Sequence, residues 1–322
     1  MEFKLRKISG DASFRQFYRL TKGKKTSIII ESKKEKFKNL IIYAAINKFL
    51  RQKDILAPKL IKEFFHRGII EIEDFGNISF FQYLDKKKNK YEDYTKIINL
   101  LLKIQKIKIK KLICSIKKHK IKLKRYDSKH LHEESDLFFN WYLVGLIGNK
   151  KAKKYKILIK KELKKIYEKI YFKNAYFVHR DFHVSNFMLV GKRIGIIDSQ
   201  DAIIGNPAYD LVSLIDDVRI KTSLSLKKKI FKFYLKKSPK IFRERVKEFR
   251  NDFNILSIQR NLKILGIFYR LFKRDKKIRY LKFIPYTWKL IELRLKDSTF
   301  KNLKLLLNKA INKKLRRQTI FK

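Results

Sequence analysis

The segment that decides the fold runs from His179 to Asn186 and reads HRDFHVSN. It places Asp181 two residues after a histidine and five residues before Asn186. In kinase-type phosphoryl transfer, a loop Asp orients the attacking hydroxyl and a nearby loop Asn holds a metal ion. A single match of this length also arises by chance, with the carboxylates capping helices. Its meaning therefore depends on the segments around it.

A tight turn directly downstream supplies that context. The apolar runs FMLV and RIGII are separated by Gly-Lys at 191–192, and Gly at the first position of a two-residue loop is typical of a β-hairpin. Counting back from the turn pairs Val190 with Arg193 and Phe187 with Ile196. The sequence therefore predicts an antiparallel hairpin immediately after the HRDFHVSN segment.

Three oxygen-bearing side chains gather at the open base of this hairpin. Asn186 and Asp198 flank its two strands, and Asp181 precedes it by a short loop. Mg²⁺ prefers oxygen ligands and keeps further positions for water and substrate phosphate oxygens. A separate carboxylate can accept the proton of an attacking hydroxyl. The pattern predicts Asp181 as the catalytic base, with Asn186 and Asp198 as Mg²⁺ ligands.

The local charge supports a cation site. Residues 176–218 contain three basic and six acidic side chains, whereas the whole chain has a formal net charge of +52. A window that stays acidic inside such a basic chain is what binding of a metal ion requires. The acidic residues are Asp181, Asp198, Asp201, Asp210, Asp216 and Asp217.

The overall charge has two readings. A value of +52 fits a polyanionic partner such as RNA, DNA or an anionic membrane. However, lysine far outnumbers arginine and is spread along the whole chain, whereas a dedicated nucleic-acid surface more often clusters arginine. We therefore favour a compositional origin of the charge, with nucleic acid as a partner that is not favoured.

Chain length and cysteine content limit the number of domains and the compartment in which the protein is expected. The 322 residues, 45% of them hydrophobic, suffice for one large domain or two lobes with a real core. The single cysteine, Cys114, rules out an internal disulfide and fits a reducing compartment. No signal peptide is visible and no apolar run reaches membrane-spanning length, so we expect a cytoplasmic protein without a membrane partner.

The chain divides into a β-rich beginning and a helical remainder. The runs FRQFYRL and KTSIIIE read as strands, residues 42–50 have helical periodicity, and APKLIKEFF and RGIIEIE read as two further strands. This predicts a β-β-α-β-β order over about the first 75 residues. The segment IKIKKLICSIKKHKIKLK reads as a helix end plus a loop, and most of the chain beyond it reads as helix.

These residues resemble the aminoglycoside phosphotransferase-like kinases. HRDFHVSN is similar to their catalytic loop, and IDSQDAIIGNPAYDLVSLI is similar to their metal-binding segment. Within that superfamily the match is closer to the kinases of bacterial cell-wall recycling, which phosphorylate N-acetylmuramate and N-acetylglucosamine at C1. The further stretches that carry this resemblance are GDASFRQFYRL, GIIEIEDFGN, YDSKHLHEESDLFFNWYL and QRNLKILGIFYRLFKRDKKIRYL.

The resemblance implies a fold and a cofactor. It implies an α+β, bilobal protein-kinase-like fold with a small antiparallel N-lobe and a larger, mostly helical C-lobe. Residues 1–75 would form the nucleotide-binding lobe and residues 76–322 the catalytic and substrate-binding lobe. ATP and Mg²⁺ would be the cofactors, and an amino sugar the small-molecule partner.

The resemblance also assigns residues to the nucleotide. The backbone from Glu73 to Phe75 would meet the adenine, and Ser13, Phe14 and Arg15 would lie over the phosphates. The same assignment makes Asp181 the base and places the metal on Asn186 and Asp198.

One departure leaves the phosphate-binding cation open. Kinases usually carry a lysine on the third strand, but this strand reads SIIIESKK, with Glu31 near the expected position. Lys33 or Lys34 could reach the phosphates, or Arg15 or Arg19 could replace the lysine.

Other residues receive weaker interpretations. His179 is expected to fix the loop through a hydrogen bond. Asp201 and Glu134 are candidate contacts to the acceptor, although a solvated charge is the simpler reading of Glu134. Trp141 could stack on a sugar ring, although aromatic residues on a helix are more often part of the core. Asp210 would brace the catalytic loop, cap a helix N-terminus, or do both.

The sequence thus favours an ATP-dependent kinase for the anomeric hydroxyl of N-acetylmuramate or N-acetylglucosamine. Two alternatives remain open. One is another kinase of the same fold that acts on an aminoglycoside, an amino alcohol or homoserine. The other is an inactive kinase fold that binds nucleic acid, which the intact Asp181, Asn186 and Asp198 disfavour.

Overall fold

The computed structural model describes residues 3–8, 15–32, 38–107, 113–117 and 119–319. Within it the chain forms two compact units, which are described separately. The first unit contains residues 1–124 and 176–204, and the second contains 125–175 and 205–322. The chain therefore leaves the first unit, builds part of the second, and returns with the HRDFHVSN segment.

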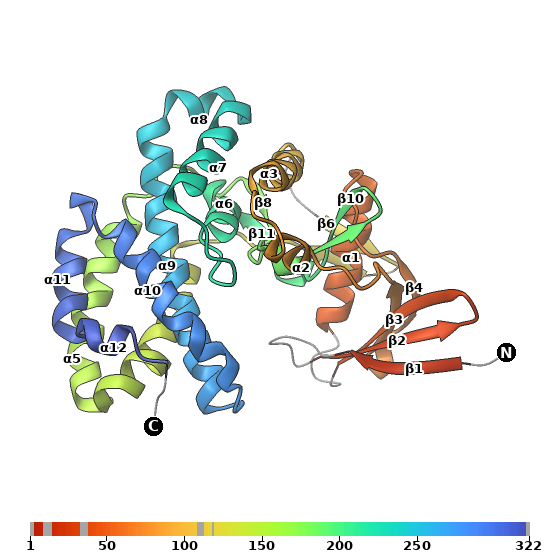
Figure 1. The fold of residues 1–322 in the computed structure, drawn as a ribbon, viewed down its shortest axis with the longest axis horizontal. Helices are drawn as coiled ribbons and strands as arrows, with labels where there is room; N and C mark the ends of the chain where they lie inside the picture. Colours follow the sequence, from red (N-terminus) through yellow and green to blue (C-terminus); the bar gives the residue numbers. More distant parts are fainter. Residues whose placement is uncertain (1–2, 9–14, 33–37, 108–112, 118, 320–322) are drawn as a thin grey trace. The chain divides into compact units, whose positions relative to one another are not determined.

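A five-stranded antiparallel sheet dominates the first unit (Figure 1). Its spatial order is β1-β2-β3-β5-β4. The strands are β1 (Phe3–Ile8), β2 (Gln16–Lys22), β3 (Lys25–Glu31), β4 (Leu60–Phe64) and β5 (Ile69–Glu73). Helix α1 (Lys38–Gln52) lies between β3 and β4 in sequence and buries an apolar face that includes Leu40, Ala44 and Ile46.

The predicted order of this sheet was incomplete. The structure adds β1, which pairs with β2 from Phe3 opposite Lys22 to Ile8 opposite Phe17. Five of its six residues are exposed, so this edge strand lacks the alternation of buried and exposed positions on which strand prediction depends. The order is therefore β-β-β-α-β-β rather than the predicted β-β-α-β-β.

The predicted hairpin is present in the first unit. Strands β9 (Phe187–Val190) and β10 (Arg193–Ile196) are antiparallel, with Val190 opposite Arg193 and Phe187 opposite Ile196. This confirms the register that the two-residue turn predicted.

The hairpin is attached to the segments that precede β4 and follow β5. The Leu189 N–H donates to the Ile78 carbonyl at 3.0 Å, and the Ile196 N–H donates to the Leu56 carbonyl at 2.8 Å. These bonds explain why residues 176–204 join the sheet in one compact unit. The predicted boundary after residue 75 falls inside this unit, and the functional division into two lobes stays a prediction.

A second hairpin corrects another prediction. The segment read as a helix end plus a loop forms β6 (Ile113–Ile116) and β7 (His119–Lys122), which pair antiparallel. The lysine-rich alternation in this segment is thus a strand pattern. The remaining elements of the first unit are α2 (Phe80–Asp85), α3 (Tyr91–Gln105) and β8 (Tyr176–Val178), which pairs with β11 (Ile203–Gly205).

The second unit is helical. Its elements are α4 (Ser128–Leu137), a π-helical turn (Phe138–Leu143), α5 (Val144–Tyr167), α6 (Ala208–Ile215), α7 (Leu224–Lys237), α8 (Lys240–Glu244), α9 (Val246–Lys273), α10 (Ile284–Arg294), α11 (Lys301–Ala310) and α12 (Lys313–Arg316). The antiparallel sheet followed by a mostly helical remainder confirms the predicted α+β class.

Helix α9 is the centre of this unit. It packs closely on the end of α4, because a Cβ on Gly266 would lie 2.2 Å from the Leu137 carbonyl carbon. Nearby, the buried Trp288 Nε1 donates to the Tyr142 hydroxyl at 2.8 Å. Among the helices that the structure describes, none is long and apolar enough to cross a membrane.

Candidate active site

The HRDFHVSN segment closes into a loop around the main chain of Asp181. The carbonyl of Asp181 accepts one hydrogen bond from the His183 N–H and one from Asn186 Nδ2, both at 2.9 Å. The Asn186 N–H in turn donates to the His183 carbonyl at 2.9 Å. The spacing of five residues is therefore what lets the Asn side chain reach back to the Asp.

Asn186 and Asp198 lie at the base of the hairpin. The Ile197 N–H donates to the Asn186 carbonyl at 3.0 Å, which makes Asp198 the next residue on the facing strand. The buried ring of His179 lies beneath them, and its Nε2 donates to the Ile197 carbonyl at 3.0 Å. Burial lowers the pKa of His179, although the carboxylates of Asp181 and Asp198 oppose this effect. His179 thus ties the loop to the hairpin, which is the position that the sequence reading gave it.

Backbone strain is concentrated at this site. Arg180 and Asp198 have φ angles of 72° and 64°, in the left-handed region that side chains other than glycine rarely adopt. Such conformations cost about 1–3 kcal/mol each and persist where the surrounding contacts impose them, often at functional sites.

The two predicted metal ligands present unused oxygens. Asn186 uses its Nδ2 on the Asp181 carbonyl, and Asp198 uses its Oδ1 on Arg15. Neither Asn186 Oδ1 nor Asp198 Oδ2 makes a hydrogen bond within the described residues. An amide oxygen and a carboxylate oxygen suit Mg²⁺. The described residues contain no cluster of three His, Cys, Asp or Glu, so a metal here would also need oxygens from its substrate.

Arg15 is the cation at this site. Its Nη2 donates to Asp198 Oδ1 at 2.5 Å and its Nη1 to Gln200 Oε1 at 3.2 Å. Its side chain is only 5% exposed, and its guanidinium lies 5.7 Å from the ring centre of Tyr43 on α1. Of the two described cations considered for the missing strand lysine, Arg15 and Arg19, Arg15 contacts a predicted metal ligand and Arg19 does not. Ser13 and Phe14, as well as Lys33 and Lys34, lie outside the described residues.

Helix α1 contributes two residues that the sequence reading missed. The Ser199 hydroxyl donates to Asn47 Oδ1 at 2.6 Å, and both side chains are buried. Burial raises the pKa of the Tyr43 hydroxyl to about 12, while its hydrogen bond to Asn47 works against that rise. The available signal was an asparagine on the apolar face of an otherwise hydrophobic helix. These contacts fix the segment after Asp198 against α1.

Arg19 binds a different set of residues from Arg15. Its Nε and Nη2 donate to the two carboxylate oxygens of Asp74 at 2.6 and 3.0 Å. It also bonds to the carbonyl of Gly76 at 3.0 Å and to the side chain of Asn77. Arg19 therefore braces the segment after β5, the predicted adenine-binding stretch.

That stretch has main-chain groups available beyond Glu73. The main-chain N–H and the carboxylate of Glu73 are already hydrogen-bonded. The N–H donates to the Lys59 carbonyl at 2.8 Å, and the carboxylate accepts from Arg51 at 2.9 Å. Within the described residues, the main-chain N–H and C=O of Phe75 make no hydrogen bond. The ring of Phe75 packs on the hairpin, and a Cβ on Gly195 would lie 2.6 Å from it. The predicted adenine segment and the catalytic hairpin are thus in direct contact.

The comparisons with known proteins agree with this geometry. The family model described as "Phosphotransferase enzyme family" matches residues 4–249. This chain belongs to that family. The phosphotransferase is also 26% identical over 294 residues to the N-acetylmuramate/N-acetylglucosamine kinase of Neisseria meningitidis, covering 88% of this chain and 83% of the relative. It is 24% identical to the enzyme of the same name from Pseudomonas aeruginosa, covering 88% and 81%.

A solved structure shares the fold. The ADP-bound aminoglycoside phosphotransferase APH(2'')-Ib superposes with a TM-score of 0.57 at 14% identity, covering 90% of this chain and 92% of that one. The predicted kinase-like fold of the phosphotransferase is therefore confirmed.

Asp201 lies beside the metal segment of the phosphotransferase. It is exposed, and its Oδ2 accepts from Gln200 Nε2 at 3.1 Å. Its contact with an acceptor stays a prediction.

The reading of Glu134 as a solvated charge is wrong. In the second unit of the phosphotransferase it is 6% exposed and accepts four hydrogen bonds. The donors and distances are Tyr126 (2.6 Å), Tyr209 (3.1 Å), Gln259 (2.9 Å) and Lys263 (2.8 Å). Through these groups Glu134 joins α4, α6 and α9. Its contact with an acceptor sugar stays a prediction.

Two other predicted residues lie in the second unit. Trp141 is half-buried on the π-helical turn, where it stays a candidate for sugar contact. Asp210 is buried in the first turn of α6, whose N-cap is Pro207. The interpretation of Asp210 as the N-cap is therefore wrong, and its bracing role stays a prediction.

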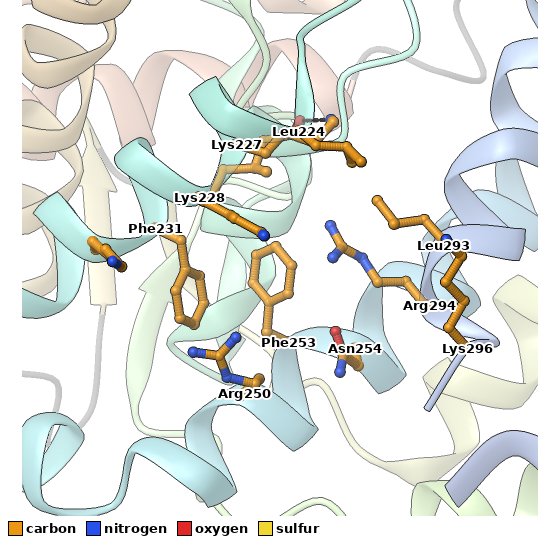
Figure 2. Close-up of a pocket in the computed structure, with 12 residues that line it drawn as sticks. Leu224, Lys227, Lys228, Phe231, Arg250, Phe253, Asn254, Leu293, Arg294 and Lys296 are labelled. Atoms are coloured by element: carbon orange, nitrogen blue, oxygen red, sulfur yellow. Dashed lines mark hydrogen bonds between the residues drawn. The ribbon is translucent and has the colours of Figure 1, made fainter. Parts of the chain in front are cut away.

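The second unit also contains a cavity of about 540 Å³ between α7, α9 and α10 (Figure 2). Phe231 and Phe253 form part of its wall, and no acidic residue lines it. Two of its cations, Lys227 and Arg294, bind the buried carboxylate of Asp216 at 3.0 and 2.8 Å. None of the predicted site residues lines this cavity. We therefore do not assign it to the predicted reaction.

Proposed function

We propose that this phosphotransferase transfers the γ-phosphoryl group of ATP to the C1 hydroxyl of N-acetylmuramate or N-acetylglucosamine in the cytoplasm. The observation that carries the proposal is the closed loop that joins Asp181, Asn186 and Asp198 at the hairpin base. The name shared by the curated relatives supports the choice of sugar.

Asp181 acts on the acceptor. Its main-chain carbonyl accepts two hydrogen bonds from the loop, and these support the proposal by fixing the backbone of Asp181. In the reaction the C1 oxygen forms a bond to the γ-phosphorus, the bond from that phosphorus to the bridging oxygen of ADP breaks, and the C1 hydroxyl proton passes to the Asp181 carboxylate. The role of the loop is to hold this carboxylate in place before the substrate arrives.

Asn186 and Asp198 would hold Mg²⁺ through the oxygens that make no hydrogen bond within the described residues. A bound Mg²⁺ supplies charge neutralisation of the phosphate oxygens. The hydrogen bond from the Ile197 N–H to the Asn186 carbonyl keeps the two residues close at the hairpin base.

Phe75 and Arg15 would bind the two ends of the nucleotide. The main chain of Phe75 offers one donor and one acceptor, the pair that an adenine edge can use. Arg15 replaces the missing strand lysine, because its guanidinium already lies on Asp198 and carries two donors toward that site. A planar guanidinium binds phosphate oxygens in a forked geometry.

The test is ADP release with Mg-ATP and a panel of N-acetylmuramate, N-acetylglucosamine, glucosamine, ethanolamine and one aminoglycoside. We expect turnover of the two N-acetyl sugars and an acid-labile anomeric phosphate as product. Asp181→Asn keeps the shape of the side chain but removes the base, so it should lose most turnover and still bind Mg-ATP. Turnover of ethanolamine or the aminoglycoside alone would move the enzyme to another acceptor class. Near wild-type rates in Asp181→Asn would remove Asp181 from the mechanism.

A further inference from the structure

The cavity between α7, α9 and α10 in the second unit has a lining that suits an anion. Its volume of about 540 Å³ falls within the range of about 300–1,000 Å³ that is usual for small-molecule sites. No acidic residue lines it, and six of its lining residues are cations: Lys227, Lys228, Lys232, Arg250, Arg294 and Lys296. Because exposed lysines are common along this chain, the cations alone do not identify a site. The buried polar groups of the lining do.

A buried cluster on the cavity wall carries one formal positive charge in excess. Lys227 and Arg294 both bind the carboxylate of Asp216, at 3.0 and 2.8 Å, and none of the three side chains is more than 15% exposed. Arg294 uses its Nε and Nη2 on Asp216, whereas its Nη1 makes no hydrogen bond within the described residues. Arg294 therefore keeps a donor for an anion in the cavity.

Asn254 adds a buried amide without a partner in the described part of the chain. It lines the cavity from α9 and is 9% exposed, and its side chain makes no hydrogen bond with any described residue. Such a group destabilises the fold, because burial removes water from the amide without replacing its hydrogen bonds. Local violations of this kind are expected where a site serves binding rather than folding.

The Asn254 amide and the Arg294 guanidinium are neighbours. Arg294 Nε also donates to the Ser257 hydroxyl at 3.3 Å. Asn254 precedes Ser257 by three residues on α9, and helix residues three apart lie on one side of the helix. Figure 2 shows Asn254 and Arg294 around the same space, with the amino group of Lys228 extending into it from α7. Donors from α7, α9 and α10 thus converge on one place.

Two aromatic rings form an apolar wall beside these donors. Phe231 of α7 and Phe253 of α9 pack edge to face, with ring centres 5.1 Å apart. The guanidinium of Arg250 lies 5.1 Å from the centre of the Phe231 ring, and that of Arg294 lies 4.9 Å from the centre of the Phe253 ring. A ligand that contacts both rings therefore also comes close to positive charge.

We propose that this cavity binds a phosphate monoester that carries an apolar ring. The phosphate oxygens accept hydrogen bonds from Arg294 Nη1, Asn254 Nδ2 and the amino group of Lys228, because a phosphate has acceptors for all three. The ring lies against Phe231 and Phe253. This ligand site is contained in the second unit and uses none of the residues assigned to phosphoryl transfer, so it does not depend on the proposed function.

The experiment is isothermal titration calorimetry of the whole protein with 1-naphthyl phosphate, in the absence of ATP and sugar. Inorganic phosphate tests the head group alone, and 1-naphthoate replaces the phosphate by a carboxylate. The cavity variants are Asn254→Leu and Lys228→Gln. One matched control is Lys229→Gln, which neutralises an exposed neighbour of Lys228 that does not line the cavity. The other is Arg15→Met, which alters the proposed active site.

We expect one site per chain for 1-naphthyl phosphate, with a Kd at least about tenfold lower than that of inorganic phosphate, because the ring buries apolar surface. Asn254→Leu removes one hydrogen bond and should raise this Kd about three- to tenfold. Lys228→Gln removes a partly screened charge and should raise it about two- to fivefold. Both controls should stay within about twofold of the wild type, as substitutions away from a site do.

Thermal unfolding without ligand separates binding from structure. Replacing an unpaired buried amide by leucine should leave Tm unchanged or raise it. If Asn254→Leu lowers Tm, the comparison of Lys228→Gln with Lys229→Gln decides, because both positions are exposed. Equal affinity of these two lysine variants would then overturn the proposal.

Three other results would also overturn it. If both cavity variants bind the probe as the wild type does, the cavity is not the site. Loss of binding in Arg15→Met alone would place the probe in the nucleotide site. Equal or tighter binding of 1-naphthoate would replace the phosphate by a carboxylate. An inactive wild type in the sugar assay would leave these results unchanged, because the titration contains neither ATP nor sugar.

Discussion

Replacing Arg15 by methionine tests the assignment of the phosphate-binding cation. The wild-type guanidinium is held by Asp198 and Gln200 and lies between the rings of Phe17 and Tyr43, at 5.5 and 5.7 Å from their centres. Methionine preserves much of the buried volume and removes the charge. The substitution therefore changes electrostatics more than packing.

Two roles of Arg15 predict different magnitudes. If Arg15 clamps the transferred phosphoryl group, its loss should lower kcat by about 10²- to 10³-fold, as for other preorganised donors to developing charge. If Arg15 only neutralises Asp198, the cost falls on folding. The Asp198 side chain is 37% exposed, so water replaces part of the lost pair and the free energy of unfolding should fall by about 1–3 kcal/mol.

The assay combines steady-state kinetics, a Mg²⁺ titration and urea unfolding. We expect the large loss in kcat together with a weaker affinity for ATP. Arg19→Met is the control, because Arg19 lies on the same strand but braces Asp74. That variant should raise KM for ATP and largely preserve kcat. If Arg15→Met retains wild-type kcat/KM at saturating Mg²⁺, then Arg15 merely competes with the metal for Asp198, and the assignment is refuted.

Two further predictions use the packing of each unit. Gly195→Ala places a Cβ 2.6 Å from the ring of Phe75, so the adenine segment must shift. Overpacking of this kind costs about 1–3 kcal/mol, and calorimetry should show a comparable loss of ADP affinity. Burial alone would raise the pKa of Asp216, but Arg294 and Lys227 hold it well below its usual range. Because the folded pKa is depressed, this contribution is complete above about pH 4 and is lost as pH falls further. Asp216→Asn should therefore cost about 3–5 kcal/mol at pH 7, with a gap to the wild type that narrows below pH 4 in urea unfolding.

The sequence predicted those parts of the fold that depend on residues close together in the chain. The register of β9 and β10 follows from a two-residue turn, so Val190 opposite Arg193 could be counted from the sequence. Strand β1 and the β6–β7 hairpin could not be recognised in the same way. Both alternate apolar and basic residues, but β1 is almost entirely exposed and no Gly, Asn, Asp or Pro marks the turn between β6 and β7, so the turn signals that bounded the predicted strands were missing.

In the candidate site, too, the sequence predicted contacts between nearby residues but not contacts between distant segments. Asn186 lies near Asp198 because one hairpin joins them, and the sequence predicted this proximity. Glu134 was misread because its partners come from distant segments, including Tyr209 and Lys263, and a helical glutamate in a basic chain looks solvated. Arg15 was one of four candidates, and its contact with Asp198, 183 residues away in the sequence, distinguishes it from Arg19, the other described candidate.

For binding an anion, the burial of a cation matters more than the number of cations in the chain. Most of its cations are exposed lysines, and exposed pairs contribute little because water screens them. Arg15 is 7% exposed, and in such surroundings a single charge interacts far more strongly with an anion. With Arg15 on the phosphates, nucleotide binding depends little on the net charge of +52, and neutralising surface lysines should leave the KM for ATP nearly unchanged.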